Sequence, residues 1–280
     1  MEAIENHGVT HLFLPPTAIY RMLAHPDVRK HKYDSLRFFT YAGAPMSPAR
    51  VEEAISVFGA VMTTSFGQTE SGLNATYFSP EEHVRALETG HLGQLLSCGR
   101  ASPFMRVEIM NEEGVLLAPG ETGEIVLRGN QIMKGYWNNE DESRRALSFG
   151  WLHTGDIGYK DPEGWVFLVD RKRDMIISGG FNIFPSEIEK CVISHPAVED
   201  CVVIGSPDAD WGEAVTAVVQ LKSGGEVDES RLRAFCRDRL GGIKTPKRFV
   251  FWADLPRSPV GKVLRRRVRE SFWLDQRRKI

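Results

Sequence analysis

The first ninety residues alternate short apolar runs with segments of helical spacing, and Ser47-Pro48 is typical of a helix start. Strands are predicted at 9–14, 36–41 and 61–65, and helices at 17–23 and from residue 47 onward. Strands that alternate with helices at this spacing indicate a parallel sheet, whose ligands bind beyond the carboxyl ends of the strands. We therefore expect the loops at Gly43 and Gly67 to face a site.

The pattern changes twice further along the chain. Short strands divided by turn clusters predict a small antiparallel barrel or sandwich over 90–172, and after Arg171-Lys172-Arg173-Asp174 the pattern is that of a small α+β domain. The expected fold is therefore α/β: a partial parallel-sheet large domain with a small β-barrel subdomain, followed by a small α+β C-terminal domain. The expected boundaries are 1–172, divided into an α/β part (1–89) and a barrel-like part (90–172), and 173–280.

Composition and charge narrow the class of protein. The chain has 280 residues, 42% of them hydrophobic and 26% charged, which is typical of a globular protein. A net charge of -2 argues against a protein that coats nucleic acid or an anionic membrane, and no apolar run is long enough to span a bilayer. The four cysteines are scattered, without metal-ligand spacing, which favours a reducing, cytoplasmic setting.

Basic residues are concentrated near the C-terminus. Residues 262–280 contain eight basic and two acidic side chains. This imbalance predicts a basic, solvated final helix, and long-range attraction of an anionic ligand is the alternative.

The densest group of polar side chains follows the third predicted strand, in Thr63-Thr64-Ser65-Phe66-Gly67-Gln68-Thr69-Glu70-Ser71-Gly72. Hydroxyl and backbone N–H groups can hold phosphoryl oxygens, Glu70 offers a hard oxygen ligand for Mg²⁺, and Phe66 offers a face for a purine. An ordinary polar turn, with Phe66 in the core, is the alternative.

Five stretches, in order along the chain, resemble the motifs of the adenylate-forming (AMP-binding) superfamily, and of acyl-CoA synthetases in particular. They are Tyr41-Ala42-Gly43-Ala44-Pro45-Met46, Ser65-Phe66-Gly67-Gln68-Thr69-Glu70, Trp151-Leu152-His153-Thr154-Gly155-Asp156, Asp170-Arg171-Lys172-Arg173-Asp174 and Pro256-Arg257-Ser258-Pro259-Val260-Gly261-Lys262. Phe66 departs from the tyrosine that is usual in the family. The resemblance covers the C-terminal half of the family's chain.

The resemblance implies a two-step reaction with ATP, Mg²⁺ and coenzyme A. A small carboxylic acid attacks the α-phosphate of ATP to give an acyl-adenylate, and a thiol then attacks the activated carbonyl and expels AMP. The implied catalytic residues are Lys262, Thr69 and Glu70, with Glu70 as the metal ligand. The implied nucleotide contacts are Gly43, Ala44, Pro45, Ser65, Phe66, Gly67, Gln68, Thr69, Asp156, Arg171 and Lys262.

Individual roles follow from the same resemblance. Asp156 would accept hydrogen bonds from both ribose hydroxyls, Arg171 would donate to the same sugar, and Lys262 would meet the charge that develops at the phosphate. Without the motifs, Asp156 would close a turn, and Arg171 and Lys262 would be solvated.

The second half-reaction has its own implied residues. Gly179 and Gly180 resemble the loop that lines the pantetheine tunnel once the C-terminal lid domain has rotated, and Trp211 resembles a residue that contacts coenzyme A, with an ordinary edge aromatic as the equal alternative. Arg173 is the expected hinge.

One departure concerns catalysis by the chain itself. The family's glycine-rich phosphate loop is absent, so we expect the chain to be incomplete for catalysis. The alternatives are a non-catalytic nucleotide- or partner-binding module, an amino-acid adenylation domain or a luciferase-like oxygenase, and the acid remains undetermined.

Overall fold

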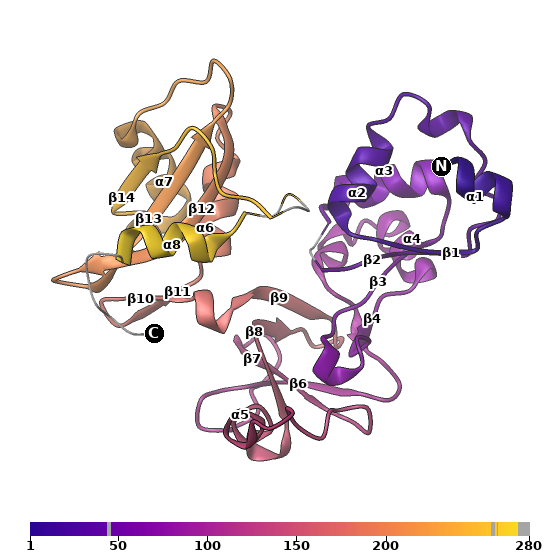
Figure 1. The fold of residues 1–280 in the computed structure, drawn as a ribbon, viewed down its shortest axis with the longest axis horizontal. Helices are drawn as coiled ribbons and strands as arrows, with labels where there is room; N and C mark the ends of the chain where they lie inside the picture. The colour runs from indigo at the N-terminus through magenta and orange to yellow at the C-terminus, as the bar shows by residue number, and fades with distance from the viewer. Residues whose placement is uncertain (44–45, 259–260, 262, 274–280) are drawn as a thin grey trace. The chain divides into compact units, whose positions relative to one another are not determined.

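The computed structural model describes residues 1–43, 46–258, 261 and 263–273 (Figure 1). The contacts divide the chain into two compact units, Met1–Leu168 and Val169–Ile280, which are described separately. The predicted boundary at 172/173 differs from this division by four residues. Val169 and Asp170 accept hydrogen bonds from Ser186, so they belong to the second unit.

The first unit begins with a parallel sheet of three strands, β1 (His11–Leu14), β2 (Phe38–Tyr41) and β3 (Met62–Thr64), in that order. Its helices are α1 (Glu2–His7), α2 (Pro16–Leu23), α3 (Pro48–Phe58) and α4 (Pro80–Glu88). The predicted alternation of strands and helices is confirmed. Short 3-10 turns lie at Val28–Lys30, Thr69–Ser71, Leu92–Leu96 and Ser148–Gly150.

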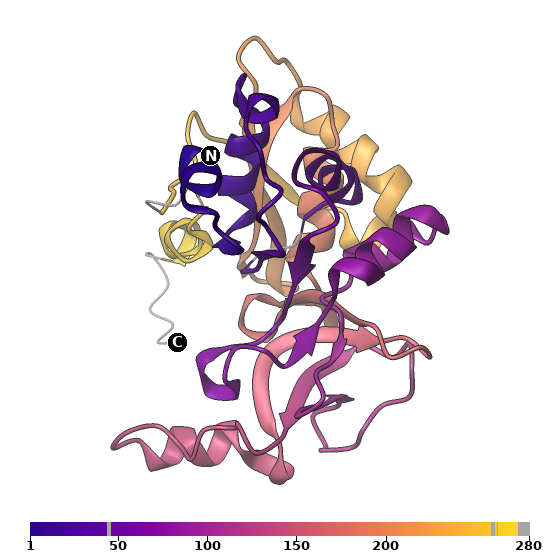
Figure 2. The ribbon, with the colours of Figure 1, turned by 90° about the vertical axis from the view of Figure 1, so that its right-hand side faces the viewer.

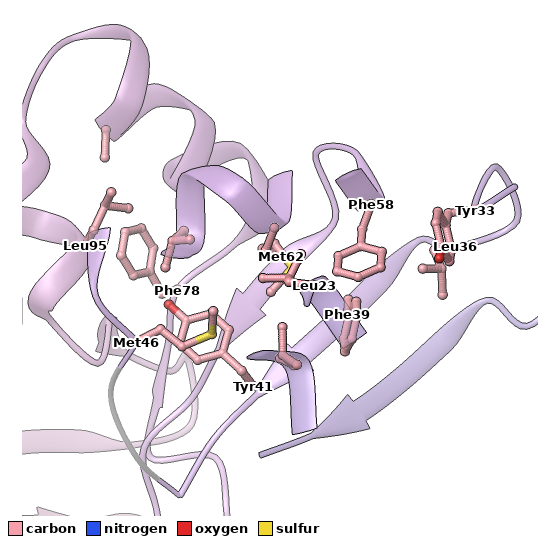
Figure 3. Packing of buried hydrophobic residues seen from close by; sticks show 14 of the residues in the cluster. Leu23, Tyr33, Leu36, Phe39, Tyr41, Met46, Phe58, Met62, Phe78 and Leu95 are labelled. Atoms are coloured by element: carbon pink, nitrogen blue, oxygen red, sulfur yellow. The ribbon is translucent and has the colours of Figure 1, made fainter. Parts of the chain in front are cut away.

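The core of this part is formed by side chains that point from the sheet and the helices toward one another (Figure 3). Phe39 of β2 and Phe58 of α3 pack edge to face with ring centroids 5.1 Å apart, and Tyr33 packs on Phe58 in the same way at 4.9 Å. Val51 and Ala54 are fully buried on the inner face of α3. The helical spacing of these apolar positions therefore explains why α3 lies on the sheet.

Helix α4 was not predicted, although the sequence contains its start signal. Ser79 accepts a hydrogen bond from the Glu82 N–H, and the Glu82 carboxylate accepts one from the Ser79 N–H, which is a capping box. Ser47, by contrast, occupies the N-cap position of α3, but its side chain makes no capping hydrogen bond.

The barrel-like region is an open sheet. Its strands are β6 (Arg106–Met110), β7 (Gly123–Arg128), β8 (Leu152–Lys160) and β9 (Val166–Arg171), in sequence order, with a two-stranded sheet of β4 (Thr76–Tyr77) and β5 (Arg100–Ala101) and helix α5 (Glu140–Ala146). In the described residues β6 does not pair with β9, so the expected barrel does not close. A four-stranded sheet is too narrow to close around a core.

The second unit is a mixed sheet covered on both faces (Figure 2). The strands are β10 (Ile176–Ser178), β11 (Phe181–Ile183), β12 (Val198–Asp208), β13 (Gly212–Leu221) and β14 (Arg248–Phe251), and a 3-10 turn spans Lys172–Asp174. Helices α6 (Pro185–Ile193) and α7 (Glu229–Lys244) pack on one face, and α8 (Arg265–Trp273) packs on the other through Val268.

The basic final helix is not simply solvated, which corrects the expectation from its charge. Arg265 is ion-paired with Asp174 and Glu189 at 2.8 Å, and Arg269 is ion-paired with Glu213 at 3.0 Å. Only the outer face of α8 fits the prediction, where the Arg266 side chain is 91% exposed. Part of the basic excess therefore neutralises acidic groups of the second unit.

All four cysteines are buried with free thiols. Burial raises the pKa of the Cys98 and Cys236 thiols to about 12, and raises those of Cys191 and Cys201 as well. No helix among the residues placed by the structure is long and apolar enough to cross a membrane.

The packing around Phe78 yields a prediction for stability. Phe78 is fully buried, stacks on His83 with centroids 3.9 Å apart and contacts the Trp165 ring at 4.7 Å. Phe78→Ala should lower the unfolding free energy of the first unit by about 4 kcal/mol, because it leaves a cavity where the Phe78 ring packs between His83 and Trp165. Urea titration, followed by hydrogen–deuterium exchange of peptides from residues 1–168, measures this change.

Phe104→Ala is the matched control, since Phe104 is 77% exposed. We expect it to change the same free energy by less than about 0.5 kcal/mol. Equal effects of the two substitutions would contradict the packing described for Phe78.

Candidate functional site

The carboxyl ends of the three parallel strands lie side by side. Leu14 is in register with Tyr41, and Tyr41 with Thr64. The Thr64 hydroxyl donates a hydrogen bond to the Tyr41 carbonyl at 2.7 Å, which joins the ends of β2 and β3. The loops that begin at Ala42 and Ser65 therefore start next to each other, as expected for a site at this edge of the sheet.

The loop after β2 is only partly described. Gly43 has a φ of +83°, a conformation that favours glycine. The predicted contacts Ala44 and Pro45 lie outside the described residues.

The loop after β3 is closed by its own backbone. The Phe66 carbonyl accepts hydrogen bonds from the N–H groups of Ala75 at 2.8 Å and Thr76 at 3.1 Å. A side chain at Gly67 would bring its Cβ within 2.1 Å of the Leu73 carbonyl oxygen, so only glycine fits there. This closure holds Ser65, Gln68 and Thr69 on a compact turn, with Thr69 exposed.

Phe66 packs inward in the structure. It is 8% exposed and belongs to the core cluster that includes Ala75, Cys98 and Leu152. Protein side chains enclose most of this residue, so little of its ring is left for contact with a purine.

Glu70 is held by a segment that the sequence analysis did not identify. The Tyr136 hydroxyl donates to Glu70 Oε1 at 2.9 Å, and the Met133 N–H donates to the Glu70 carbonyl at 2.8 Å. Burial and the neighbouring Glu70 carboxylate raise the pKa of the Tyr136 hydroxyl, which keeps it a donor. The signal available in the sequence was the pair Tyr136-Trp137, two adjacent aromatics in a polar stretch.

The Glu70 carboxylate could supply one oxygen ligand to a magnesium ion. Within the described ranges, no group of three or more histidine, cysteine, aspartate or glutamate side chains could hold a metal. A Mg²⁺ ion at Glu70 would therefore take most of its ligands from phosphate oxygens and water, which is its usual mode in nucleotide sites.

Asp156 lies in a bulge of β8 instead of a turn. Glu124 pairs with Ile157 and Val126 pairs with His153, so Thr154, Gly155 and Asp156 lie opposite the single residue Ile125, and β8 contains two extra residues here. Gly155 has a φ of +70°. A bulge redirects a strand side chain, which is why bulges are common beside active sites.

Hydrogen bonds of two side chains, one on each strand, hold this bulge in shape. The Glu124 carboxylate accepts hydrogen bonds from the Gly155 N–H at 3.0 Å and from His153 Nδ1 at 3.1 Å. The Thr154 hydroxyl donates to the Ile125 carbonyl at 2.7 Å and accepts from the Asp156 N–H at 3.1 Å. The sequence analysis did not identify Glu124. The available signal was a carboxylate placed directly before the apolar run Ile125-Val126-Leu127.

The bulge and the loop after β3 are built on the same part of the first unit. The Asp156 charge is one of the smaller causes that raise the pKa of Cys98. The carbonyl of Cys98 accepts a hydrogen bond from the Thr76 hydroxyl, which in turn accepts one from the Phe66 N–H at 3.0 Å. Phe66 at the base of the loop that carries Thr69 and Glu70, and Leu152 at the start of the strand that carries the bulge, belong to one core cluster.

The remaining candidates belong to the second unit. Arg171 is exposed at the end of β9, and Arg173 is exposed in the 3-10 turn that follows. Lys262, the predicted catalytic lysine, lies outside the described residues.

The three candidate contacts for coenzyme A are neighbours. Gly179 and Gly180, both with positive φ, form the two-residue turn between β10 and β11. A Cβ at Gly179 would lie 2.3 Å from the Trp211 ring, and the Gly179 N–H donates to the Trp211 carbonyl at 3.0 Å. Trp211 is 46% exposed, and Lys247 Nζ lies 3.1 Å from the centroid of its ring. The Lys247 contact was not predicted.

Comparison with known proteins places the chain in a family. The AMP-binding enzyme family matches residues 1–137, and the AMP-binding enzyme C-terminal domain matches residues 187–262. The chain is 39% identical over 280 residues to the medium/long-chain-fatty-acid–CoA ligase FadD8 of Mycobacterium tuberculosis, covering 98% of this chain and 48% of that protein. It is 37% identical to the fatty acid–[acyl-carrier-protein] ligase ScoC of Streptomyces coeruleorubidus, covering 100% of this chain and 53% of that protein.

A solved structure agrees. The amide bond synthetase McbA of Marinactinospora thermotolerans superposes with a TM-score of 0.82 at 37% identity, covering 97% of this chain and 54% of that one. The chain belongs to the family of AMP-binding enzymes, which confirms the resemblance seen in its motifs. It spans about half the length of the relatives it matches.

A buried histidine behind the sheet edge leads to a prediction for pH. The Tyr41 hydroxyl donates to His83 Nε2 at 2.9 Å, and His83 Nδ1 donates to the Ser79 carbonyl at 2.8 Å, so the ring is neutral. Burial lowers the pKa of His83 from 6.5 to about 4. As the pH falls, the unfolded chain takes up a proton at this histidine at a higher pH than the folded chain does. The stability that the neutral His83 ring contributes is therefore fully present above pH 6.5 and is lost as the pH falls toward 4.

We expect the first unit to lose about 2 kcal/mol between pH 7.5 and pH 5 from this group alone. In His83→Gln that part of the loss should be absent, because glutamine keeps hydrogen-bonding groups but does not titrate. Urea unfolding at the two pH values measures it, with His7→Gln at an exposed position as the control. A pH dependence that is unchanged in His83→Gln would contradict this prediction.

Proposed function

We propose that the protein of which this chain is a part activates a small carboxylic acid with ATP and transfers the acyl group to coenzyme A. The observation that carries the proposal is the Asp156 bulge, built on the same core as the Thr69–Glu70 turn in a member of the AMP-binding family. This arrangement provides a ribose acceptor and phosphate-binding groups on one unit.

In the first step, each residue is assigned by the chemistry of its side chain. Asp156 accepts hydrogen bonds from the ribose hydroxyls, and the Thr69 hydroxyl and nearby N–H groups bind the α-phosphate. Bound Mg²⁺ at Glu70 would neutralise phosphate charge. Tyr136 orients the Glu70 carboxylate by donating to one of its oxygens.

The charged side chains of the second unit complete the assignment. Lys262 stabilises the negative charge that develops as the carboxylate oxygen bonds to phosphorus and pyrophosphate leaves. Arg171 donates to the ribose. These two roles rest on the family's motifs.

In the second step, the thiol of coenzyme A attacks the acyl carbonyl and AMP leaves. We assign contacts with the cofactor to Gly179, Gly180 and Trp211, whose close packing forms one surface. Lys262 and this surface serve different steps, so the second unit must change its orientation between them, and we assign the rotation to Arg173. The predicted division 1–172 and 173–280 places this hinge at the start of the second part.

The acceptor of the acyl group is the main alternative. The relatives are named as a CoA ligase, an acyl-carrier-protein ligase and an amide bond synthetase, so the family alone does not choose among acceptors. The exposed Trp211 favours a free cofactor, because its ring offers apolar surface beside the Gly179–Gly180 turn. A chain that binds AMP but releases no pyrophosphate would instead be a non-catalytic nucleotide-binding module.

Asp156→Asn should weaken AMP binding roughly tenfold or more, because the amide accepts only on one atom where the carboxylate accepts on two. Isothermal titration calorimetry measures the affinity of the chain alone and of the chain co-expressed with the first half of a relative. An unchanged affinity in both forms would return Asp156 to a structural role.

Asp161→Asn is the control for this experiment. Asp161 Oδ1 accepts the Trp165 N–H at 2.8 Å and closes a turn of the same sheet. We expect this substitution to lower stability and to leave AMP affinity unchanged.

Glu70→Gln should abolish the strengthening of ATP binding by Mg²⁺ while leaving metal-free binding within about twofold, because a neutral amide is a poor ligand for this ion. Titration of ATP with and without MgCl₂ gives both affinities. Glu88→Gln, at the exposed end of α4, should retain the full metal effect. Retention of that effect in Glu70→Gln would place the ion elsewhere.

A further inference from the structure

The segment around the assigned hinge is held by a cluster of charged and polar side chains within the second unit. We call this cluster the hinge clamp; it consists of Asp170, Asp174, Ser186, Glu189 and Arg265. Its members come from the end of β9, the 3-10 turn, α6 and the first residue of α8. The roles assigned above to the family's motifs do not use Ser186, Glu189 or Arg265.

Arg265 is the centre of the hinge clamp. Its Nη2 donates to both carboxylate oxygens of Glu189 at 2.8 Å, and its Nη1 donates to Asp174 Oδ2 at 2.8 Å. The same Nη1 lies 3.8 Å from Asp170 Oδ1. A planar guanidinium can hold separate carboxylates on separate nitrogens, which an ammonium group cannot do with the same geometry.

Ser186 attaches the other side of the hinge. Its N–H donates to Asp170 Oδ2 at 2.8 Å, and its hydroxyl donates to the Val169 carbonyl at 2.5 Å. Val169 and Asp170 precede the exposed Arg171 and Arg173, and Asp174 follows them. The hinge clamp therefore grips the chain on both sides of the assigned pivot.

Arg265 supplies the positive charge of the hinge clamp. Three carboxylates surround one guanidinium, and the Asp170 side chain is 4% exposed. Burial raises the pKa of Glu189, and the Arg265 charge opposes this rise. Removing the guanidinium leaves close carboxylates with little solvent between them, so the hinge segment should separate from α6.

The helix that carries Arg265 also follows the predicted catalytic lysine. Lys262 precedes Arg265 by three positions, and α8 begins at Arg265. The loop before α8 is held at its other end by Arg257, which donates to Asp200 at 2.6 Å and to the Gly261 carbonyl at 3.2 Å. The start of the helix after Lys262 and the hinge segment thus share one anchor.

We propose that Arg265 is a positioning residue that holds the hinge segment 169–174 and the start of α8 in one arrangement, and that rotation about Arg173 requires Asp170 to leave the hinge clamp. Asp174 and Glu189 stay with Arg265 in such a rotation, because both follow the pivot in the chain. The rotation about Arg173 rests on the proposed function. The proposal that Arg265 holds residues 169–174 in place does not depend on that function.

The sequence of the hinge itself supplies the test. Arg171, Lys172 and Arg173 are trypsin sites, and cleavage there requires the segment to leave its contacts. In the full 280-residue chain, Arg265→Met should speed cleavage at these sites roughly tenfold or more, while sites in α7 keep their rates. Mass spectrometry of the fragments separates the sites. Arg265→Lys should give an intermediate rate, because it keeps the charge but loses the forked geometry.

Two further variants make the result specific. Arg266→Met is the matched control. Among the contacts of the described residues, Arg266 forms an ion pair only with Glu270 of the same helix. Cleavage of this variant at residues 171–173 should be as slow as in the unaltered chain. Asp174→Asn should speed cleavage after Arg171 as well, and combining it with Arg265→Met should not multiply the two effects there, because both remove the same contact. Cleavage after Arg173 is left out of this comparison, because Asp174→Asn changes the residue next to that bond.

Three results would overturn the proposal: unchanged cleavage at 171–173 in Arg265→Met, full multiplication of the two effects in the double variant, or an equal rise at all sites with a lower urea midpoint. The last result would mean global unfolding, and if Arg265→Met fails to fold, Arg265→Lys and Asp174→Asn decide the question. Failure of AMP binding would overturn the proposed function instead and would leave these rates unaffected.

Discussion

The candidate site of the first unit depends on the register of its three parallel strands. Leu14, Tyr41 and Thr64 are neighbours, and the bond from the Thr64 hydroxyl to the Tyr41 carbonyl prevents the strand ends from separating. A shift by one residue would turn the buried side chains of β2 toward the wrong face and would move the two loops apart. The buried His83 supports the same edge through Tyr41, so the core and the site share one constraint.

Local chemistry made much of the fold predictable. The strands of the parallel sheet and the start of α3 carry strong local signals, because apolar period and proline position act over a few residues. The turn around Gly67 was predictable for the same reason, and the structure adds why glycine is required there. The family's motifs made Asp156 and the hinge candidates recognisable, although their roles remain proposals.

Other features depend on residues that are distant in the sequence. The bond from Tyr136 to Glu70 spans 66 positions, and the contacts of Arg265 with Glu189 span 76. The pattern of apolar and polar residues does not predict contacts between such distant positions. The acidic partners of Arg265 were therefore not foreseen, and the basic tail was expected to be solvated. The barrel prediction was wrong for a related reason, because the number of strands that pair around a sheet is set by tertiary packing. The bulge at Asp156 depends on Glu124 of the neighbouring strand.

The burial of all four thiols offers a direct way to observe the two units. A buried thiol with a raised pKa contains little thiolate at neutral pH, and maleimide dyes react with thiolate. A cysteine introduced at an exposed position of each unit would therefore be labelled in preference to the native ones. Energy transfer between two such dyes would report the distance between the units in solution, without removing any natural cysteine.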